Sequence, residues 1–149
     1  LIFTQNRTGW DGRRFKIYKL RTLKKESFDK TVQVAKNDKR VLKFGRLIRR
    51  YSIDELPQFY NVFIGDMSIV GPRPLFDEDT KLFDTRYMRR LNVMPGITGL
   101  LQINDRNTDD FSVWFKYDLS YIENWSIYLD LKIMFQTPLA VFKKNKKGL

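Results

Sequence analysis

Residues 52–74, SIDELPQFYNVFIGDMSIVGPRP, contain the strongest local signals in the chain. Apolar residues at helical spacing predict a helix that begins near Asp54, keeps Pro57 in its first turn and ends at Gly65. Beyond that helix, two prolines fix the backbone on both sides of Arg73. A stiff loop therefore presents the Arg73 guanidinium, which suits bidentate capture of a phosphate and would equally suit a structural ion pair.

Asp54 and Glu55 stand at the expected N-terminus of this helix. The helix dipole and the free N–H groups stabilise negative charge there, so capping alone would explain both acids. A carboxylate can also act as a nucleophile without first losing a proton, and phosphoryl transfer depends on positioning and charge more than on a strong base. At this point both interpretations of the acidic pair stay open.

The N-terminal part of the chain predicts a hairpin. Residues 1–23 form two short strand patterns around the turn at residues 9–12, with near-alternation of apolar and basic side chains in the second. Residues 24–37 lack a period and predict a loop. Residues 40–51 predict a basic amphipathic helix, which either packs against a core with a solvated basic face or contacts a membrane or a phosphate.

Composition excludes several kinds of chemistry. The 149 residues fit one domain of ordinary size, residues 1–149, and 42% hydrophobic content is enough for one core. The chain has no His and no Cys, which excludes imidazole and thiol catalysis and the metals that those side chains bind. Any reaction must use carboxylates, Lys, Arg, Tyr, Ser or Thr, with at most an oxygen-preferring cation.

Positive charge is concentrated in the first third of the chain. Residues 1–50 contain 16 Lys and Arg against 4 Asp and Glu, a net charge of +12, whereas residues 51–149 contain 12 against 13, a net charge of −1. This excess predicts a polyanionic partner: nucleic acid, an anionic membrane surface or a substrate with several phosphates. A surface that only improves solubility is the alternative. No apolar stretch approaches the roughly 18 residues of a membrane-spanning helix.

Four separated segments together resemble one known family. These segments are residues 3–23, 49–74, 93–107 and 117–134. In unbroken order they resemble the bacterial sugar transferases, monotopic phosphoglycosyl transferases that move a sugar phosphate from a UDP-sugar onto polyprenyl phosphate. The resemblance implies a catalytic domain at the cytoplasmic face of the bacterial inner membrane. It also implies a membrane-anchoring segment upstream of Leu1.

The resemblance also implies roles for individual residues. Asp54 would form a covalent phosphosugar intermediate, and Glu55 would help to hold Mg²⁺. Phosphate charge would be met by Lys19, Arg49 and Arg73, the last within a Pro72-Arg73-Pro74 motif. Three further residues fall on positions around the nucleotide sugar: Gln102, Arg106 and Asp118. The chain departs from the family pattern at Leu20, Leu100 and Asp105, which affects packing near the sugar and the geometry of one loop.

We therefore expect an α+β domain with a small antiparallel sheet and several amphipathic helices along the membrane face. The predicted function is transfer of a sugar-1-phosphate from a UDP-sugar to undecaprenyl phosphate with release of UMP, the first step in assembly of an exopolysaccharide, O-antigen, capsule or glycoprotein glycan. The alternatives are a basic nucleic-acid-binding module or a membrane-surface adaptor without catalysis. Aromatic-rich residues 59–63 and 114–125 lie outside the basic third, which argues against nucleic acid. The sequence does not identify the sugar, and it is compatible with a homo-oligomer.

Overall fold

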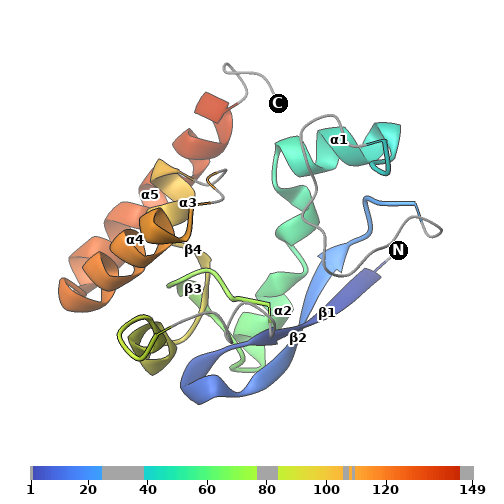
Figure 1. Cartoon of the computed structure of the whole chain (residues 1–149). Coiled ribbons are helices and arrows are strands. Elements are labelled where there is room, and N and C mark those ends of the chain that lie inside the picture. The colour runs from blue at the N-terminus through green and yellow to red at the C-terminus, as the bar shows by residue number, and fades with distance from the viewer. Residues whose placement is uncertain (1, 25–38, 77–83, 106–107, 109, 145–149) are drawn as a thin grey trace.

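The computed structural model describes residues 2–24, 39–76, 84–105, 108 and 110–144. Figure 1 shows the N-terminal hairpin and helices α1 and α2 on one side, helices α3, α4 and α5 on the other, and strands β3 and β4 between them. Helices and short strands are thus mixed along the chain. The expected α+β class with a small antiparallel sheet is confirmed.

The predicted hairpin is present. Strand β1 (Ile2–Thr8) pairs antiparallel with β2 (Arg14–Leu20), and a 3₁₀ turn, η1 (Trp10–Gly12), connects them. Phe15 and Ile17 on β2 are buried and pack with Met67, while Lys16 between them is exposed. This alternation buries one face of the hairpin. Lys19 belongs to the same face as Phe15 and Ile17, whereas Lys16 lies on the opposite face.

The middle of the chain forms three short helices, α1 (Lys43–Arg50), η3 (Ile53–Glu55) and α2 (Gln58–Phe63). The prediction of one helix from Asp54 to Gly65 was wrong. Pro57 has no N–H to donate, and the backbone on both sides of it uses the tighter 3₁₀ pattern: Leu56 N–H bonds to the Ile53 carbonyl and Tyr60 N–H to the Pro57 carbonyl. Helix α1 begins three residues later than expected. The predicted loop falls almost entirely on residues 25–38, outside the described residues.

A second pair of strands brings distant parts of the chain together. Strand β3 (Ser68–Val70) pairs in parallel with β4 (Gly96–Thr98), a pairing that the sequence did not predict. A Cβ on Gly96 would collide with the backbone nitrogen of Gly71, so only glycine permits this close approach. The 3₁₀ helix η5 (Tyr87–Asn92) lies between the two strands in sequence.

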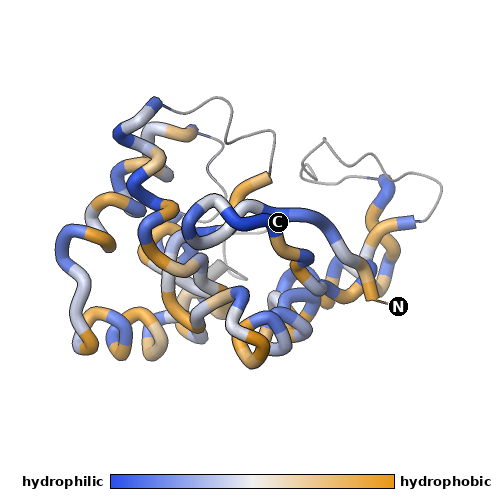
Figure 2. Tube along the Cα trace, turned by 90° about the horizontal axis from the view of Figure 1, so that it is seen from below, coloured by the Kyte–Doolittle hydropathy of each residue, from blue (hydrophilic) through white to orange (hydrophobic). Residues whose placement is uncertain are grey.

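The C-terminal part is helical, with α3 (Leu100–Asn104), α4 (Phe111–Glu123) and α5 (Ile127–Lys144). Buried side chains of this part form two clusters, one around Leu101 and Trp114 and one around Tyr121 and Ile133. In Figure 2 hydrophobic residues recur along helices at the edge of the molecule. Among the described helices, none is both long enough and apolar enough to cross a bilayer.

Candidate active site

The two acidic residues of η3 lie inside the protein. Asp54 is 8% exposed and Glu55 is 7% exposed. A buried carboxylate is costly unless it is paired, and Glu55 is paired twice: its Oε1 lies 3.4 Å from Lys19 Nζ and 3.5 Å from an Arg73 guanidinium nitrogen. Glu55 is therefore more than a helix cap, because it joins strand β2 to the loop that follows β3.

The environment of Lys19 changes its protonation. Burial lowers the pKa of Lys19 from 10.5 to about 8. The Glu55 carboxylate opposes this shift, whereas the positive charges of Arg73 and Arg7 add to it, and Asp54 has a smaller opposing effect. Cations thus lie close together at a buried site, and a bound anion would relieve their repulsion.

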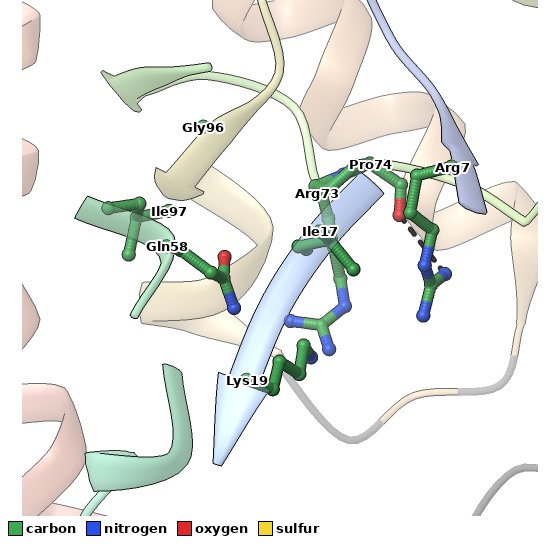
Figure 3. Close-up of a pocket in the computed structure, with 8 residues that line it drawn as sticks. All are labelled: Arg7, Ile17, Lys19, Gln58, Arg73, Pro74, Gly96 and Ile97. Carbon is green, nitrogen blue, oxygen red and sulfur yellow. Dashed lines mark hydrogen bonds between the residues drawn. The ribbon is translucent and has the colours of Figure 1, made fainter. Parts of the chain in front are cut away.

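These cations line one pocket, drawn in Figure 3. The charged ends of Lys19 and Arg73 point to the same place, although they come from β2 and from the loop after β3. Gln58, at the start of α2, and Arg7, on β1, also line the pocket. The sequence analysis missed both. Gln58 is 3% exposed. It could have been found from the sequence, because it is a polar residue at the start of a mostly apolar helix, one turn after the acidic pair.

The Pro72-Arg73-Pro74 loop is held by side chains from two other parts of the chain. Arg7 donates to the Pro74 carbonyl at 3.3 Å, the dashed line in Figure 3, and its guanidinium lies 3.4 Å from the ring centre of Phe76. Arg90 of η5 donates to the Arg73 carbonyl. Pro72 and Pro74 are buried, and the Arg73 side chain is 27% exposed. The stiff loop expected from the two prolines is thus fixed further by hydrogen bonds.

Asp118 lies on α4 and is 3% exposed. Its Oδ2 lies 3.0 Å from an Arg90 guanidinium nitrogen and accepts a hydrogen bond from the Tyr87 hydroxyl at 3.4 Å. Burial raises the pKa of Asp118 to about 6, while Arg90 and the Tyr87 hydroxyl act in the opposite direction. Asp118 is not one of the residues that line the pocket of Figure 3.

The remaining predicted residues are spread over several elements. Arg49, at the end of α1, donates to the Thr22 hydroxyl at 3.5 Å, close to the end of β2. Gln102 lies on α3, and within the described residues neither atom of its buried amide has a hydrogen-bond partner. Arg106 falls outside the described residues. The proposed contacts of these three residues with a nucleotide sugar stay predictions.

The side chains near the acidic pair offer oxygen ligands only. Within the part of the chain that the structure describes, no group of three or more His, Cys, Asp or Glu side chains is placed to hold a metal ion. Mg²⁺ is commonly bound by one or two carboxylates together with substrate phosphates, and two adjacent carboxylates beside a cationic pocket fit that arrangement.

Comparison with known proteins identifies the family. A family model described as "Bacterial sugar transferase" matches residues 1–144. A UDP-glucose:undecaprenyl-phosphate glucose-1-phosphate transferase of Klebsiella pneumoniae is 49% identical, over 96% of this chain and 32% of that protein. The uncharacterized sugar transferase EpsL of Bacillus subtilis is 46% identical, over 90% and 66%. A UDP-N-acetylgalactosamine-undecaprenyl-phosphate N-acetylgalactosaminephosphotransferase of Aeromonas hydrophila is 42% identical, over 92% and 34%.

The chain spans between 32% and 66% of the length of these three relatives. The match extends over nearly all of its own residues, including the hairpin, the acidic pair and the Pro72-Arg73-Pro74 loop. The resemblance predicted from four sequence segments is therefore confirmed, and the chain belongs to the bacterial sugar transferase family.

Proposed function

We propose that this chain transfers a sugar-1-phosphate from a UDP-sugar to undecaprenyl phosphate and releases UMP. The two relatives named for a complete reaction act on a UDP-sugar and undecaprenyl phosphate, and they differ in the sugar, which is glucose in one and N-acetylgalactosamine in the other. The observation that carries the proposal is the placement of buried Asp54 and Glu55 beside Lys19 and Arg73. This arrangement combines a carboxylate nucleophile with cations that can bind a diphosphate.

The proposed reaction has two steps. A carboxylate oxygen of Asp54 attacks the sugar-linked phosphorus, the bond from that phosphorus to the bridging oxygen breaks, and UMP leaves with the electron pair. An oxygen of undecaprenyl phosphate then attacks the same phosphorus, and the Asp54 carboxylate is regenerated. Neither step needs a proton to be removed from the nucleophile, which suits a chain without His or Cys.

Lys19 and Arg73 hold the phosphates during both steps. A guanidinium can bind two phosphate oxygens through parallel hydrogen bonds, and an ammonium supplies a compact positive charge. Both side chains contact Glu55 in the structure. When a diphosphate enters, it competes with Glu55 for these cations, which makes the Glu55 carboxylate available as a ligand.

Mg²⁺ is the cofactor that we propose for this site, with Glu55 as its protein ligand and substrate phosphates as further ligands. When bound, the ion would neutralise negative charge that develops on the diphosphate. Glu55→Gln replaces a charged ligand oxygen by a neutral one. We therefore expect this variant to be slow and to need a higher Mg²⁺ concentration for half-maximal rate.

We also propose that the protein acts at the cytoplasmic face of the inner membrane, where undecaprenyl phosphate and a soluble nucleotide sugar can reach one site in turn. Helix α5 supports this location because its exposed side chains include Ile127, Tyr128 and Phe135, which are 71%, 76% and 78% exposed. Phe44 of α1 and Phe63 of α2 are 71% and 87% exposed. Amphipathic helices with such faces lie in the membrane interface without crossing it.

The experiment that tests the function is incubation with a panel of UDP-sugars and Mg²⁺, followed by measurement of UMP and of the protein mass. We expect UMP release with at least one sugar and a mass increase of one phosphosugar on Asp54. Asp54→Asn should keep the melting temperature within a few degrees and lose both signals, because an amide is a far poorer nucleophile. A non-catalytic membrane adaptor would release no UMP with any sugar, and full activity of Asp54→Asn would exclude the covalent route.

A further inference from the structure

The loop that carries Arg73 is held at each residue from 71 to 75. Backbone groups hold three of these residues: Gly71 N–H donates to the Thr98 carbonyl at 2.9 Å, Gly96 N–H donates to the Pro72 carbonyl at 2.9 Å, and Thr8 N–H donates to the Leu75 carbonyl at 3.1 Å. The other two carbonyls, those of Arg73 and Pro74, accept hydrogen bonds from the side chains of Arg90 and Arg7. Two buried arginines thus hold the peptide groups directly next to the Arg73 side chain.

The two arginines come from different places. Arg7 lines the pocket itself. Arg90 lies on η5 and is 3% exposed, and the hydrogen bond described between it and the loop goes to the backbone carbonyl of Arg73. Its guanidinium is in turn bound by Asp118, at 3.0 Å, and by the Tyr87 hydroxyl, to which it donates at 3.2 Å.

The chemistry of a guanidinium explains why these partners matter. Its N–H bonds point in fixed directions within one plane, so partners on one side determine where the remaining hydrogens point. Asp118 and Tyr87 also bind each other, at 3.4 Å, which limits the orientations that both can take. Without Asp118, the buried Arg90 would lose the carboxylate that pairs with it and would not keep this position.

We infer that Arg90, Asp118 and Tyr87 form a positioning unit that sets the backbone of Arg73 and, through it, the direction of the Arg73 guanidinium. The inference rests on the proposed function, because it assigns these residues to transfer of the phosphosugar. It gives Asp118 a role different from the one implied by the resemblance. Asp118 acts through Arg90 and does not touch the nucleotide sugar.

A double-mutant cycle separates the two roles. We measure kcat/KM for UMP release in the wild type, Asp118→Asn, Arg73→Ala and the double variant. A misplaced guanidinium should cost about ten-fold or more in the Asp118→Asn single variant, mainly in kcat. In the Arg73→Ala background the same change should cost less than about two-fold, because no guanidinium remains to be positioned. If the two losses multiply, Asp118 acts independently of Arg73 and the inference is overturned.

Glu123→Gln is the matched control. Glu123 lies on the same helix as Asp118 and pairs at 3.2 Å with Arg89, the neighbour of Arg90, but the side chains of Glu123 and Arg89 are both about half exposed. The control therefore removes one charge and one ion pair between the same two elements without touching Arg73. We expect kcat/KM of Glu123→Gln to stay within about two-fold of the wild type, since exposed ion pairs contribute little.

Two further measurements keep the inference testable when the first variant or the first assay fails. If Asp118→Asn does not fold, Tyr87→Phe removes only the hydroxyl and enters the same cycle with Arg73→Ala. A proton NMR signal from Arg73 Nε–H, assigned by its loss in Arg73→Lys, should shift in Asp118→Asn or Tyr87→Phe and stay in place in Glu123→Gln. An unchanged signal in a folded variant overturns the inference. No UMP from the wild type with any UDP-sugar defeats the proposed function instead, and the NMR signal then decides the inference alone.

Discussion

At the scale of single residues, Lys19 shows how burial and function are connected. Its ammonium is kept in a cationic pocket although burial and two arginines lower its pKa to about 8. The folded protein therefore holds a charge that its own environment disfavours, and the Glu55 and Asp54 carboxylates oppose this effect. A site of this kind gains most when an anionic substrate enters, because the anion stabilises the charged form of Lys19.

This environment predicts how the rate depends on pH. Lys19 is protonated below pH 8 and loses its charge above it, so kcat/KM, which reports the free enzyme, should fall with an apparent pKa near 8. In Lys19→Arg the guanidinium stays charged, and the fall should disappear even if the rate at pH 7 is lower. Lys16→Arg, at an exposed position on the same strand, is the control and should keep the wild-type profile. A flat wild-type profile up to pH 9.5 would contradict this role for Lys19.

Asp118 predicts a pH dependence of stability. Its carboxyl titrates at about 6 in the folded state and near 3.8 as an isolated group, so between these values the folded state binds more protons than the unfolded state. The free energy of unfolding should therefore decrease as pH rises from about 4 to about 6, by at most about 3 kcal/mol at 1.4 kcal/mol per pKa unit. Asp118→Asn has no such titration. Unfolding midpoints measured from pH 4 to 7.5 should show the wild type losing stability relative to this variant. Parallel curves would contradict the shifted pKa.

Some residues of the candidate site were named from the sequence, and others were not. Asp54 and Glu55 were named from their place at a helix N-terminus, Arg73 from its two flanking prolines and Lys19 from the family resemblance. The structure brings Glu55, Lys19 and Arg73 into contact, and their catalytic roles stay predictions. Arg7 and Arg90 were not predicted because their roles arise from contacts with distant parts of the chain. Arg7 and the Pro74 carbonyl, for example, are separated by 67 positions in sequence. No spacing rule connects such residues.

At the scale of elements, the packing of helix α1 against the end of β2 sets the position of η3 relative to the hairpin. Gly45 is buried in α1, and a Cβ there would lie 2.6 Å from the carbonyl oxygen of Thr22. This contact leaves no room for any side chain, so the glycine allows α1 to approach the end of β2 closely. Helix α1 leads through Tyr51 and Ser52 directly into η3, which means that a shift of α1 moves the acidic pair.

Gly45→Ala tests this packing because two effects compete. Alanine has a helix propensity about 1 kcal/mol better than glycine, whereas forcing a methyl group against a backbone oxygen typically costs 1–3 kcal/mol. We expect the clash to dominate and the protein to lose about 1–2 kcal/mol of stability, measured as a lower midpoint of thermal unfolding. Arg46→Ala, the exposed neighbour on the same helix, should change the midpoint little. A raised midpoint for Gly45→Ala would mean that the Thr22 backbone moves away easily.

The elements also show which parts of the fold are readable from sequence. The hairpin was predicted because the turn at residues 9–12 is followed by near-alternation of apolar and basic side chains, which is a local signal. The break between η3 and α2 was not, because proline is tolerated in a first helical turn and only the backbone hydrogen bonds reveal the tighter turns. The β3–β4 pair was missed because its strands have three residues each, too few for any periodicity.

At the scale of the whole molecule, charge and exposed apolar surface have different positions in sequence. The net charge of +12 belongs to residues 1–50, and many exposed apolar side chains belong to α5 at the other end of the chain. Tyr51, at the end of α1, and Phe142 of α5 nevertheless lie with their ring centres 6.4 Å apart. The end of the basic helix α1 therefore contacts the apolar helix α5. One anionic lipid bilayer can bind α1 through its headgroups and α5 through its hydrocarbon.

The last prediction concerns binding to such a surface. Co-sedimentation should show binding to anionic vesicles that weakens as salt is added, because each surface Lys or Arg contributes at most about 1 kcal/mol and exposed charges are screened within about 8 Å at physiological ionic strength. Phe135→Glu should weaken binding at low salt as well, because it removes an apolar side chain that is 78% exposed. Gln136→Glu adds the same charge at the next, exposed position and controls for repulsion from anionic lipid. Equal binding to neutral and anionic vesicles, or no binding at low salt, would mean that the basic residues serve the phosphates of the substrate and that α5 has another partner.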